Sequence, residues 1–390
     1  MKIYMKTFSP LAKLFIFSFL IHLLVTLLIH YFHFYPFGNL DDLYYHETAV
    51  GLAEQFRQGN FSLSNFSLPN YYPVYLGIIY ALFGPFMLIG KAIGIILSSL
   101  TAVIIYLIIR ELNRSKKIAF LIALLSNFYP SYLYYSSLLL KDTLVVPLSL
   151  FGLWLIIKLI KKIDLKILII FFLNTLALFY IRNYTAVILF LTFFLSLLIS
   201  KESKDFRKIL TFPTIILITC FFPYFLGYGY FGFNFFSRLL NPETITQVRE
   251  TVYSIGGSAI GLNLDFSNFL TFLKTYSLSF INVLLGPLPW QMKTISTQLA
   301  AIETIPWYFL LFFIIKGLLK SSFLKASLPL LIFGLGLIAA IAFFSDNLGA
   351  NTRLRMAAFL SLFCLLPLVF PRISVTRIPR INTNSANSEN

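Results

Sequence analysis

Long apolar runs recur from one end of the chain to the other, separated by shorter polar segments. Each run is long enough to cross a hydrocarbon core of about 30 Å as a helix. The runs are too long and too uniformly apolar for the strands of a membrane barrel. The pattern therefore predicts an all-α polytopic membrane protein with about ten transmembrane helices, at residues 11–32, 88–109, 118–134, 142–158, 167–181, 184–200, 209–227, 305–319, 326–344 and 355–370.

The sequence predicts one transmembrane domain followed by a short tail. The first apolar run is longer than the core of a signal peptide and lacks a small-residue cleavage site, so we expect a retained helix. Residues 1–372 form the predicted domain. Residues 373–390 are polar, ending in "INTNSANSEN", and are predicted to be a disordered cytoplasmic tail.

Basic residues predict the orientation of the helices. Short basic segments such as "RELNRSKK", "KLIKKIDLK" and "KESKDFRK" lie between alternate runs. With the N-terminus in the cytoplasm, 21 of the 31 Lys and Arg residues fall on the cytoplasmic side, as the positive-inside rule requires. Both termini are therefore predicted to be cytoplasmic, and we expect a prokaryotic plasma (inner) membrane. The net charge of +16 then reflects membrane topology, and no nucleic-acid partner is expected.

The outer side carries most of the acidic residues and the two long connections, about 33–87 and 228–304. Ten of the 15 Asp and Glu residues fall there. The cytoplasmic loops are too short for a nucleotide-binding domain and contain no Walker or Rossmann glycine pattern. We therefore expect any chemistry on the outer face. The second connection is rich in aromatic residues and glycine, which is typical of a lid, an acceptor groove or an interfacial anchor.

The first outer connection contains "FGNLDDLYYHETAVGLAEQ", in which Asp41 and Asp42 are adjacent. Apolar positions that follow them at helical spacing are Tyr45, Ala49, Leu52, Ala53 and Phe56. This spacing predicts an amphipathic helix on the membrane surface, followed by a second surface or half-buried helix in "LPNYYPVYLGIIYALFGP". The two aspartates are either caps of the first helix or chemical groups, and the helix dipole would favour their ionised form.

Cations stand at several predicted outer helix ends, where the positive-inside rule disfavours them. Lys141 and Asp142 begin one span, Arg182 lies between two spans, and Arg353 and Arg355 begin the last. These charges also have structural explanations. Lys141 and Asp142 can pair with each other, the lysine can snorkel to the membrane interface, and Arg182 can simply mark the end of a span. Arginine forks suit phosphate oxygens. Together with the carboxylates, these residues predict a site for a phosphate-linked substrate beside a base.

The order and spacing of several segments resemble a known family. The segments are "DDLYYHETAVGLA", "YYPVYLGIIYALFG", "KAIGIILSSLTAVIIYLIIREL" and "FYPSYLYYSSLLLKDTLVV". Over roughly the first 190 residues the chain is similar to the GT-C integral-membrane glycosyltransferases, in particular the family 39-like branch of protein O-mannosyltransferases and aminoarabinose transferases. It has Asp-Asp where Asp-Glu is frequent and Lys-Asp where an acid alone is frequent. The second departure leaves the identity of donor and acceptor open.

The resemblance implies a fold of many helices, an active site on the outer face, and a polyprenyl-phosphate-linked sugar as donor. It also implies a catalytic acid in the first outer connection, which by position is Asp41, with Asp42 as its partner. The acceptor would be a glycan, a lipid or a protein. No cofactor is required; if a divalent cation is used, Asp41 and Asp42 would hold it.

The predicted function is transfer of the sugar to an acceptor on the outer face with inversion. Asp41 would act as general base, and the leaving phosphate would be stabilised by cations. The predicted phosphate-binding residues are Lys141, Arg182, Arg353 and Arg355. The candidate supporting residues are Tyr45, His46 and Asp142.

Two other functions remain open at this stage. A polysaccharide polymerase or ligase that uses a lipid-linked oligosaccharide would share the phosphate chemistry but need a larger acceptor groove. A transporter or flippase of a lipid-linked sugar would favour charges at the membrane midplane and internal repeats. The chain shows no internal repeat, and its charges gather at predicted outer helix ends, which disfavours transport.

Overall fold

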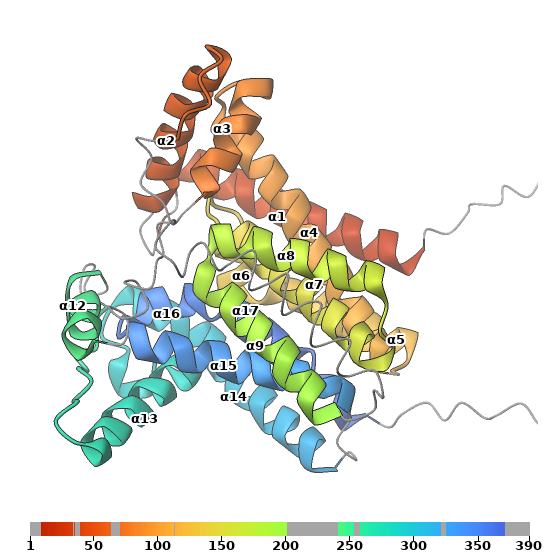
Figure 1. The fold of residues 1–390 in the computed structure, drawn as a ribbon, viewed down its shortest axis with the longest axis vertical. Helices are drawn as coiled ribbons and strands as arrows, with labels where there is room; N and C mark the ends of the chain where they lie inside the picture. The colour runs from red at the N-terminus through yellow and green to blue at the C-terminus, as the bar shows by residue number, and fades with distance from the viewer. Residues whose placement is uncertain are drawn as a thin grey trace, which may run out of the picture.

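The architecture is helical throughout the part of the chain that the computed structural model describes (Figure 1). The described residues are 9–33, 35, 40–63, 71–112, 114–200, 241–252, 258–320 and 325–370. Within these ranges the only extended pairing is an isolated antiparallel bridge between Ala259 and Asn347. The all-α prediction is therefore confirmed for the described residues.

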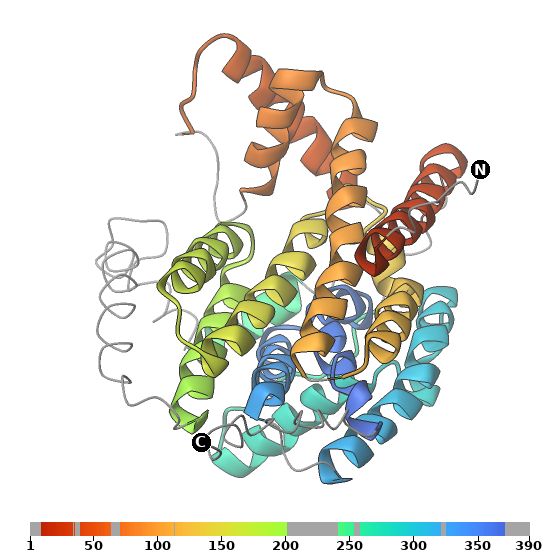
Figure 2. The ribbon, with the colours of Figure 1, turned by 90° about the vertical axis from the view of Figure 1, so that its right-hand side faces the viewer.

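The first four helices form the N-terminal part of the bundle. They are α1 (Pro10–Phe32), α2 (Leu40–Arg57), α3 (Tyr72–Phe83) and α4 (Met87–Glu111). The Ser9 side chain caps α1 by accepting a hydrogen bond from the Ala12 N–H (3.2 Å), and Pro10 follows it at the first helical position. Helix α4 packs against α1, while α2 and α3 lie side by side beyond the end of α4 (Figures 1 and 2).

The predicted apolar face of α2 is confirmed, but α3 covers it. All five predicted positions on this face are buried. The two helices approach closely because Gly77 lies at the contact: a Cβ there would stand 2.9 Å from the Cβ of Leu52 and 3.3 Å from the Phe56 ring. The amphipathic pattern thus reports packing between two helices. That α2 and α3 lie on a membrane surface stays a prediction.

The next six elements centre on α7. They are α5 (Lys116–Leu125), η1 (Ser126–Phe128), α6 (Pro130–Tyr135), α7 (Asp142–Lys161), α8 (Leu165–Ile181) and α9 (Asn183–Ser200). The predicted continuous helix at 118–134 is instead divided into α5, η1 and α6. Pro130 explains the division, because the residue before a proline avoids the helical region; Tyr129 is extended there, with φ −70° and ψ 108°.

The C-terminal elements include helices where the sequence indicated a loop. They are α12 (Pro242–Val252), α13 (Phe269–Leu285), η2 (Pro289–Gln291), α14 (Ile295–Lys320), η3 (Lys325–Ser327), α15 (Leu328–Phe344), α16 (Leu348–Leu354), α17 (Met356–Phe363) and η4 (Leu366–Val369). The predicted outer connection 228–304 thus contains α12, α13 and the start of α14. Helix α13 is apolar and packs against α15.

Five described helices are long and apolar enough to cross a membrane, and the number rises to six if the bent α16–α17 segment counts as one span. Helices α8, α9 and α13 are apolar but shorter. The predicted helix at 209–227 lies outside the described residues. The prediction of a membrane-spanning helical protein is therefore supported, whereas the number ten is not confirmed.

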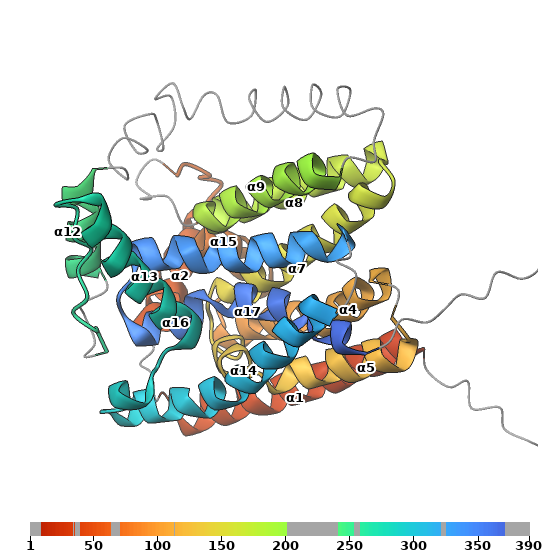
Figure 3. The same ribbon diagram turned by 90° about the horizontal axis from the view of Figure 1, so that it is seen from below.

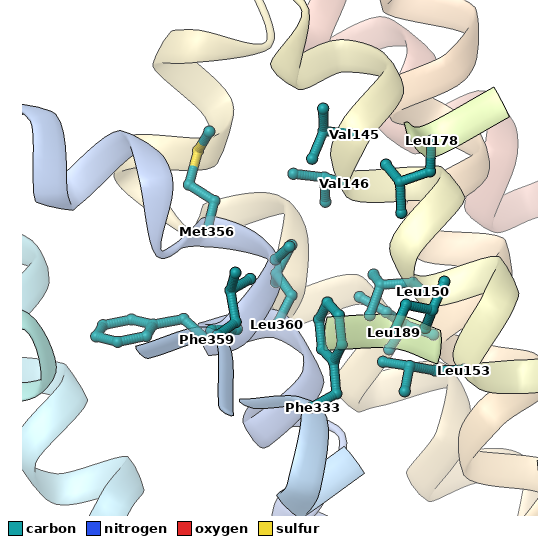
Figure 4. Packing of buried hydrophobic residues seen from close by; sticks show 14 of the residues in the cluster. Val145, Val146, Leu150, Leu153, Leu178, Leu189, Phe333, Met356, Phe359 and Leu360 are labelled. Atoms are coloured by element: carbon teal, nitrogen blue, oxygen red, sulfur yellow. The ribbon is translucent and has the colours of Figure 1, made fainter. Parts of the chain in front are cut away.

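The core lies around α7, which packs against α4, α8, α9, α15 and α17 (Figure 3). Its interior is built from branched aliphatic and aromatic side chains of these helices (Figure 4). Leu150 of α7, Leu189 of α9 and Phe333 of α15 each have no exposed surface. This packing fixes the first residue of α7, Asp142, relative to the neighbouring helix ends.

Candidate active site

The two adjacent aspartates of α2 have different environments. The Asp42 side chain is 1% exposed; its Oδ1 accepts the Leu139 N–H (2.7 Å), and its Oδ2 lies 3.3 Å from Lys91 Nζ. These last two atoms are within ion-pair distance but are not aligned for a hydrogen bond. The Asp41 side chain is 52% exposed. Successive helical residues point about 100° apart, so α2 can bury one carboxylate and present the other.

Asp142 lies between two arginines from distant parts of the chain. Its Oδ1 is 2.8 Å from Arg182 Nη2, and its Oδ2 accepts a hydrogen bond from Arg353 Nε (2.6 Å). Arg353 also donates from Nη1 to Asp41 Oδ2 (2.5 Å). The guanidinium of Arg353 therefore joins the buried Asp142 to the half-exposed Asp41, which uses the fork geometry that distinguishes arginine from lysine. We call Asp41, Lys141, Asp142, Arg182 and Arg353 the charged cluster.

Each member of the charged cluster stands at or next to a helix end. Asp41 is in the first turn of α2, Asp142 is the first residue of α7, and Arg353 is in the last turn of α16. Arg182 occupies the one-residue break between α8 and α9. Carboxylates are favoured at helix N-termini and cations at C-termini, so the helix dipoles stabilise three of these placements.

Lys141, which precedes α7, supplies positive charge that the cluster's carboxylates do not neutralise. No carboxylate of the described residues lies within ion-pair distance of its side chain, whereas both arginines contact Asp142. Burial, followed by the charges of Arg182 and Arg353, lowers the pKa of Lys141 to about 7. With Lys141 protonated, the cluster contains three cations and two carboxylates. The arrangement is therefore suited to an anionic ligand.

Arg355 lies outside the charged cluster, although it was predicted to bind the same phosphate. It is 1% exposed and donates from Nη2 to Glu303 Oε1 (2.9 Å). Its Nη1 donates to the backbone oxygens of Val283 (2.9 Å) and Gly286 (2.6 Å), and its guanidinium lies 4.4 Å from the centre of the Phe359 ring. Its role in phosphate binding stays a prediction, and its present contacts join the C-terminal end of α13 to α14 and α17.

Glu303 connects the same region to α6. It accepts hydrogen bonds from the Tyr129 hydroxyl (3.2 Å) and from the Ser131 N–H (3.1 Å). It also lines a mainly apolar cavity of about 300 Å³, together with Trp307 and Phe359. The predicted outer end of α14 is thus tied to the first turn of α6.

Two of the three predicted supporting residues, Tyr45 and His46, pack between α2 and α3, whereas Asp142 belongs to the charged cluster. His46 Nδ1 lies 3.0 Å from the Tyr80 hydroxyl, and burial lowers the pKa of His46. Tyr45 is buried and packs edge-to-face on Tyr72, with ring centres 5.1 Å apart. Both residues thus support the helix that carries Asp41. Within the described ranges, no group of three or more His, Cys, Asp and Glu side chains is placed to hold a metal ion.

Two charged residues of this region, Lys91 and Glu303, are not among the site residues predicted from the sequence. Lys91 lies inside an apolar run and is 2% exposed. A lone lysine within a predicted span was a usable signal, because a charge is costly there unless it has a partner. Glu303 was counted only as an outer acid. Its partner, Arg355, is 52 positions away, so no local pattern connects the two.

Comparison with known proteins supports the predicted resemblance. Residues 69–226 match the family model described as dolichyl-phosphate-mannose-protein mannosyltransferase. No curated protein matched the chain. The family match confirms the resemblance to GT-C glycosyltransferases and supports a membrane glycosyltransferase of that type. The matched region contains Lys141, Asp142 and Arg182 but begins after Asp41 and ends before Arg353.

Proposed function

We propose that this protein transfers a sugar from a polyprenyl-phosphate carrier to an acceptor on the outer face of the membrane, with inversion at the sugar. The observation that carries the proposal is the contact of Arg353 with both Asp41 and Asp142. It places Asp41, a half-exposed carboxylate, within a charged cluster whose cations outnumber its carboxylates. The family match supports the reaction class, and the family's description names dolichyl-phosphate-mannose, a lipid-phosphate-linked sugar.

Asp41 acts as the general base in this proposal. The proton of the acceptor hydroxyl passes to the Asp41 carboxylate as the acceptor oxygen bonds to the anomeric carbon. The bond between that carbon and the phosphate oxygen breaks on the opposite side, and its electron pair stays on the phosphate. The products are the glycosylated acceptor and the free lipid phosphate. Attack opposite to the leaving group inverts the configuration.

The cations of the cluster stabilise the charge that develops on the leaving phosphate. Lys141 is the natural first ligand, because no carboxylate of the cluster lies within ion-pair distance of it in the described structure. Arg353 and Arg182 add guanidinium groups, and Asp142 holds both of them in place. Asp142 is an unsuitable base because two arginines already surround it.

The test uses purified protein in nanodiscs, supplied with polyprenyl-phosphate sugars and with peptide, lipid and glycan acceptors. Asp41→Asn should lower the transfer rate by about 100-fold or more while the protein remains folded, because general base catalysis typically contributes that much. Glu47→Gln is the matched control, since Glu47 is an exposed carboxylate of the same helix. Near-normal turnover of Asp41→Asn would refute the assignment of Asp41 as the general base. A wild-type protein that is inactive with every donor would refute the proposed function.

A further inference from the structure

The connection between α15 and α16 is held by a segment from a distant part of the chain. Helix α15 ends at Phe344 and α16 begins at Leu348, so three residues form the break. The Ile260 N–H donates to the Asp346 backbone oxygen (3.0 Å), and the Leu348 N–H donates to the Ser258 backbone oxygen (3.0 Å). Two backbone hydrogen bonds in opposite directions thus attach the segment to the break.

The backbone of this segment turns sharply beside the break. Gly261 has φ +72°, a left-handed conformation that suits glycine. Burial raises the pKa of the Asp346 carboxyl, against the opposing effects of Arg249 and of the nearby backbone N–H groups of Gly261 and Leu262. Asp346 itself is 5% exposed. The segment therefore covers the break and brings backbone N–H groups toward the buried Asp346, whose Oδ1 has no hydrogen-bond partner among the described residues.

Arg249 of α12 reaches the same place from another direction. It is 1% exposed, and its Nη1 donates to the Ala342 backbone oxygen (2.8 Å) near the end of α15. Its Nη2 donates to the Leu262 backbone oxygen (2.6 Å). The last carbonyl groups of a helix lack partners within the helix and favour a nearby cation. Arg249 thus caps α15 and joins α12 to the covering segment, as the neighbouring positions of α12, α13, α15 and α16 illustrate (Figures 1 and 3).

Helix α16 is fixed at both ends, and it carries Arg353. At its start, Asn347 Oδ1 accepts from the Ala350 N–H (3.0 Å) and from the Ser258 hydroxyl (2.8 Å). At its end, Arg355 is held by the ion pair with Glu303. Arg353 lies five positions after the first residue of α16, or about 7.5 Å along a helix that rises 1.5 Å per residue. A shift at the break therefore reaches Arg353 through a short, rigid element.

We infer that Arg249 is a positioning residue, which sets the place of Arg353 by holding the α15–α16 break together with residues 258–262. The inference rests on the proposed function, in which Arg353 contacts the donor phosphate. Displacement of a catalytic group by about 1 Å can reduce a rate roughly 100-fold, so a loose break would lower turnover even though Arg249 touches no substrate.

The test is a double-mutant cycle between Arg249 and Arg353. Arg249→Gln should lower kcat about tenfold in the wild-type background and less than about twofold in the Arg353→Lys background, because positions that act through one another are not additive. The KM for the acceptor should not change. Arg249→Lys should recover part of kcat. Lys274→Gln is the matched control, since Lys274 is an exposed cation of α13. Equal losses of kcat in both backgrounds would overturn the inference.

Hydrogen exchange tests the docking without requiring activity. Arg249→Gln should accelerate exchange of the backbone amides in residues 345–354, and Lys274→Gln should leave it unchanged. Unchanged exchange in Arg249→Gln would overturn the inference whatever the transfer rates. A wild type that transfers no sugar, combined with faster exchange in Arg249→Gln, would count against the proposed function alone and would support the docking of the break.

Discussion

The lysine at the start of α7 should make donor recognition depend on pH. Its pKa is lowered to about 7, first by partial burial of the side chain and then by the charges of Arg182 and Arg353. A lysine with a lowered pKa carries its charge below that value and loses it as the pH rises. The site of the free protein should therefore have its extra positive charge below pH 7 and lack it well above. Replacing Lys141 with arginine would keep the charge at every accessible pH.

The size of the effect follows from the titration curve. If only the protonated form of Lys141 binds the donor phosphate, half of the molecules are competent at pH 7 and roughly one in a hundred at pH 9. The value of kcat/KM for the donor, which reports groups of the free enzyme, should then fall about fiftyfold between these pH values. A bound phosphate favours the charged lysine, so kcat should fall less than kcat/KM does.

Initial rates of sugar transfer in nanodiscs, measured at varied donor concentration and pH, provide the assay. Lys141→Arg should remove the fall between pH 7 and pH 9. Lys141→Met should lower kcat/KM at pH 7 and give a nearly flat profile above it. Lys274→Arg is the control for a cation outside the site. A flat wild-type profile, or the same fall in Lys141→Arg, would refute the assignment of Lys141 as a phosphate ligand.

Three further substitutions test the surrounding structure. Asp142→Asn should lower the free energy of unfolding by roughly 3–5 kcal/mol, because it removes the shared counter-charge of two largely buried arginines; equilibrium unfolding monitored by tryptophan fluorescence would measure this. Arg355→Met should destabilise the protein similarly but leave the KM for the donor unchanged, since its partner is Glu303; a raised KM would restore its predicted phosphate role. Gly77→Val should cost about 1–3 kcal/mol because its side chain would overlap Leu52, and Gly51→Val, which meets no neighbouring atom, is the control.

Periodicity predicted which positions are buried better than it predicted what covers them. The apolar face of α2 was correct, yet a second helix covers it, because apolar side chains are buried equally well by protein and by lipid. The same ambiguity explains α13, which lies in a region predicted to be a loop. Its apolar pattern is 17 residues long and contains polar interruptions, so it falls short of a typical span.

The sequence likewise predicted where charged residues stand but not which residues they pair with. The unusual positions of Arg353 and Arg355 on the predicted outer side were visible from the sequence, but their separate environments were not. The two residues are two positions apart at the junction of α16 and α17, so helical geometry points their side chains about 200° apart, one to Asp142 and the other to Glu303. These partners are 211 and 52 positions away, and only the packed helices establish such pairings.

Among the carboxylates in and near the charged cluster, the distribution of partners favours Asp41 as the proposed base. Asp42 is buried with a lysine and a backbone N–H, Asp142 lies between two arginines, and Glu303 accepts from three donors. A carboxylate enclosed in this way cannot approach an acceptor hydroxyl without first breaking its own contacts. Asp41 has one ion-pair partner, Arg353, and half of its side chain is exposed. A donor phosphate would compete for that same guanidinium, so donor binding would release the base close to the bond that must break.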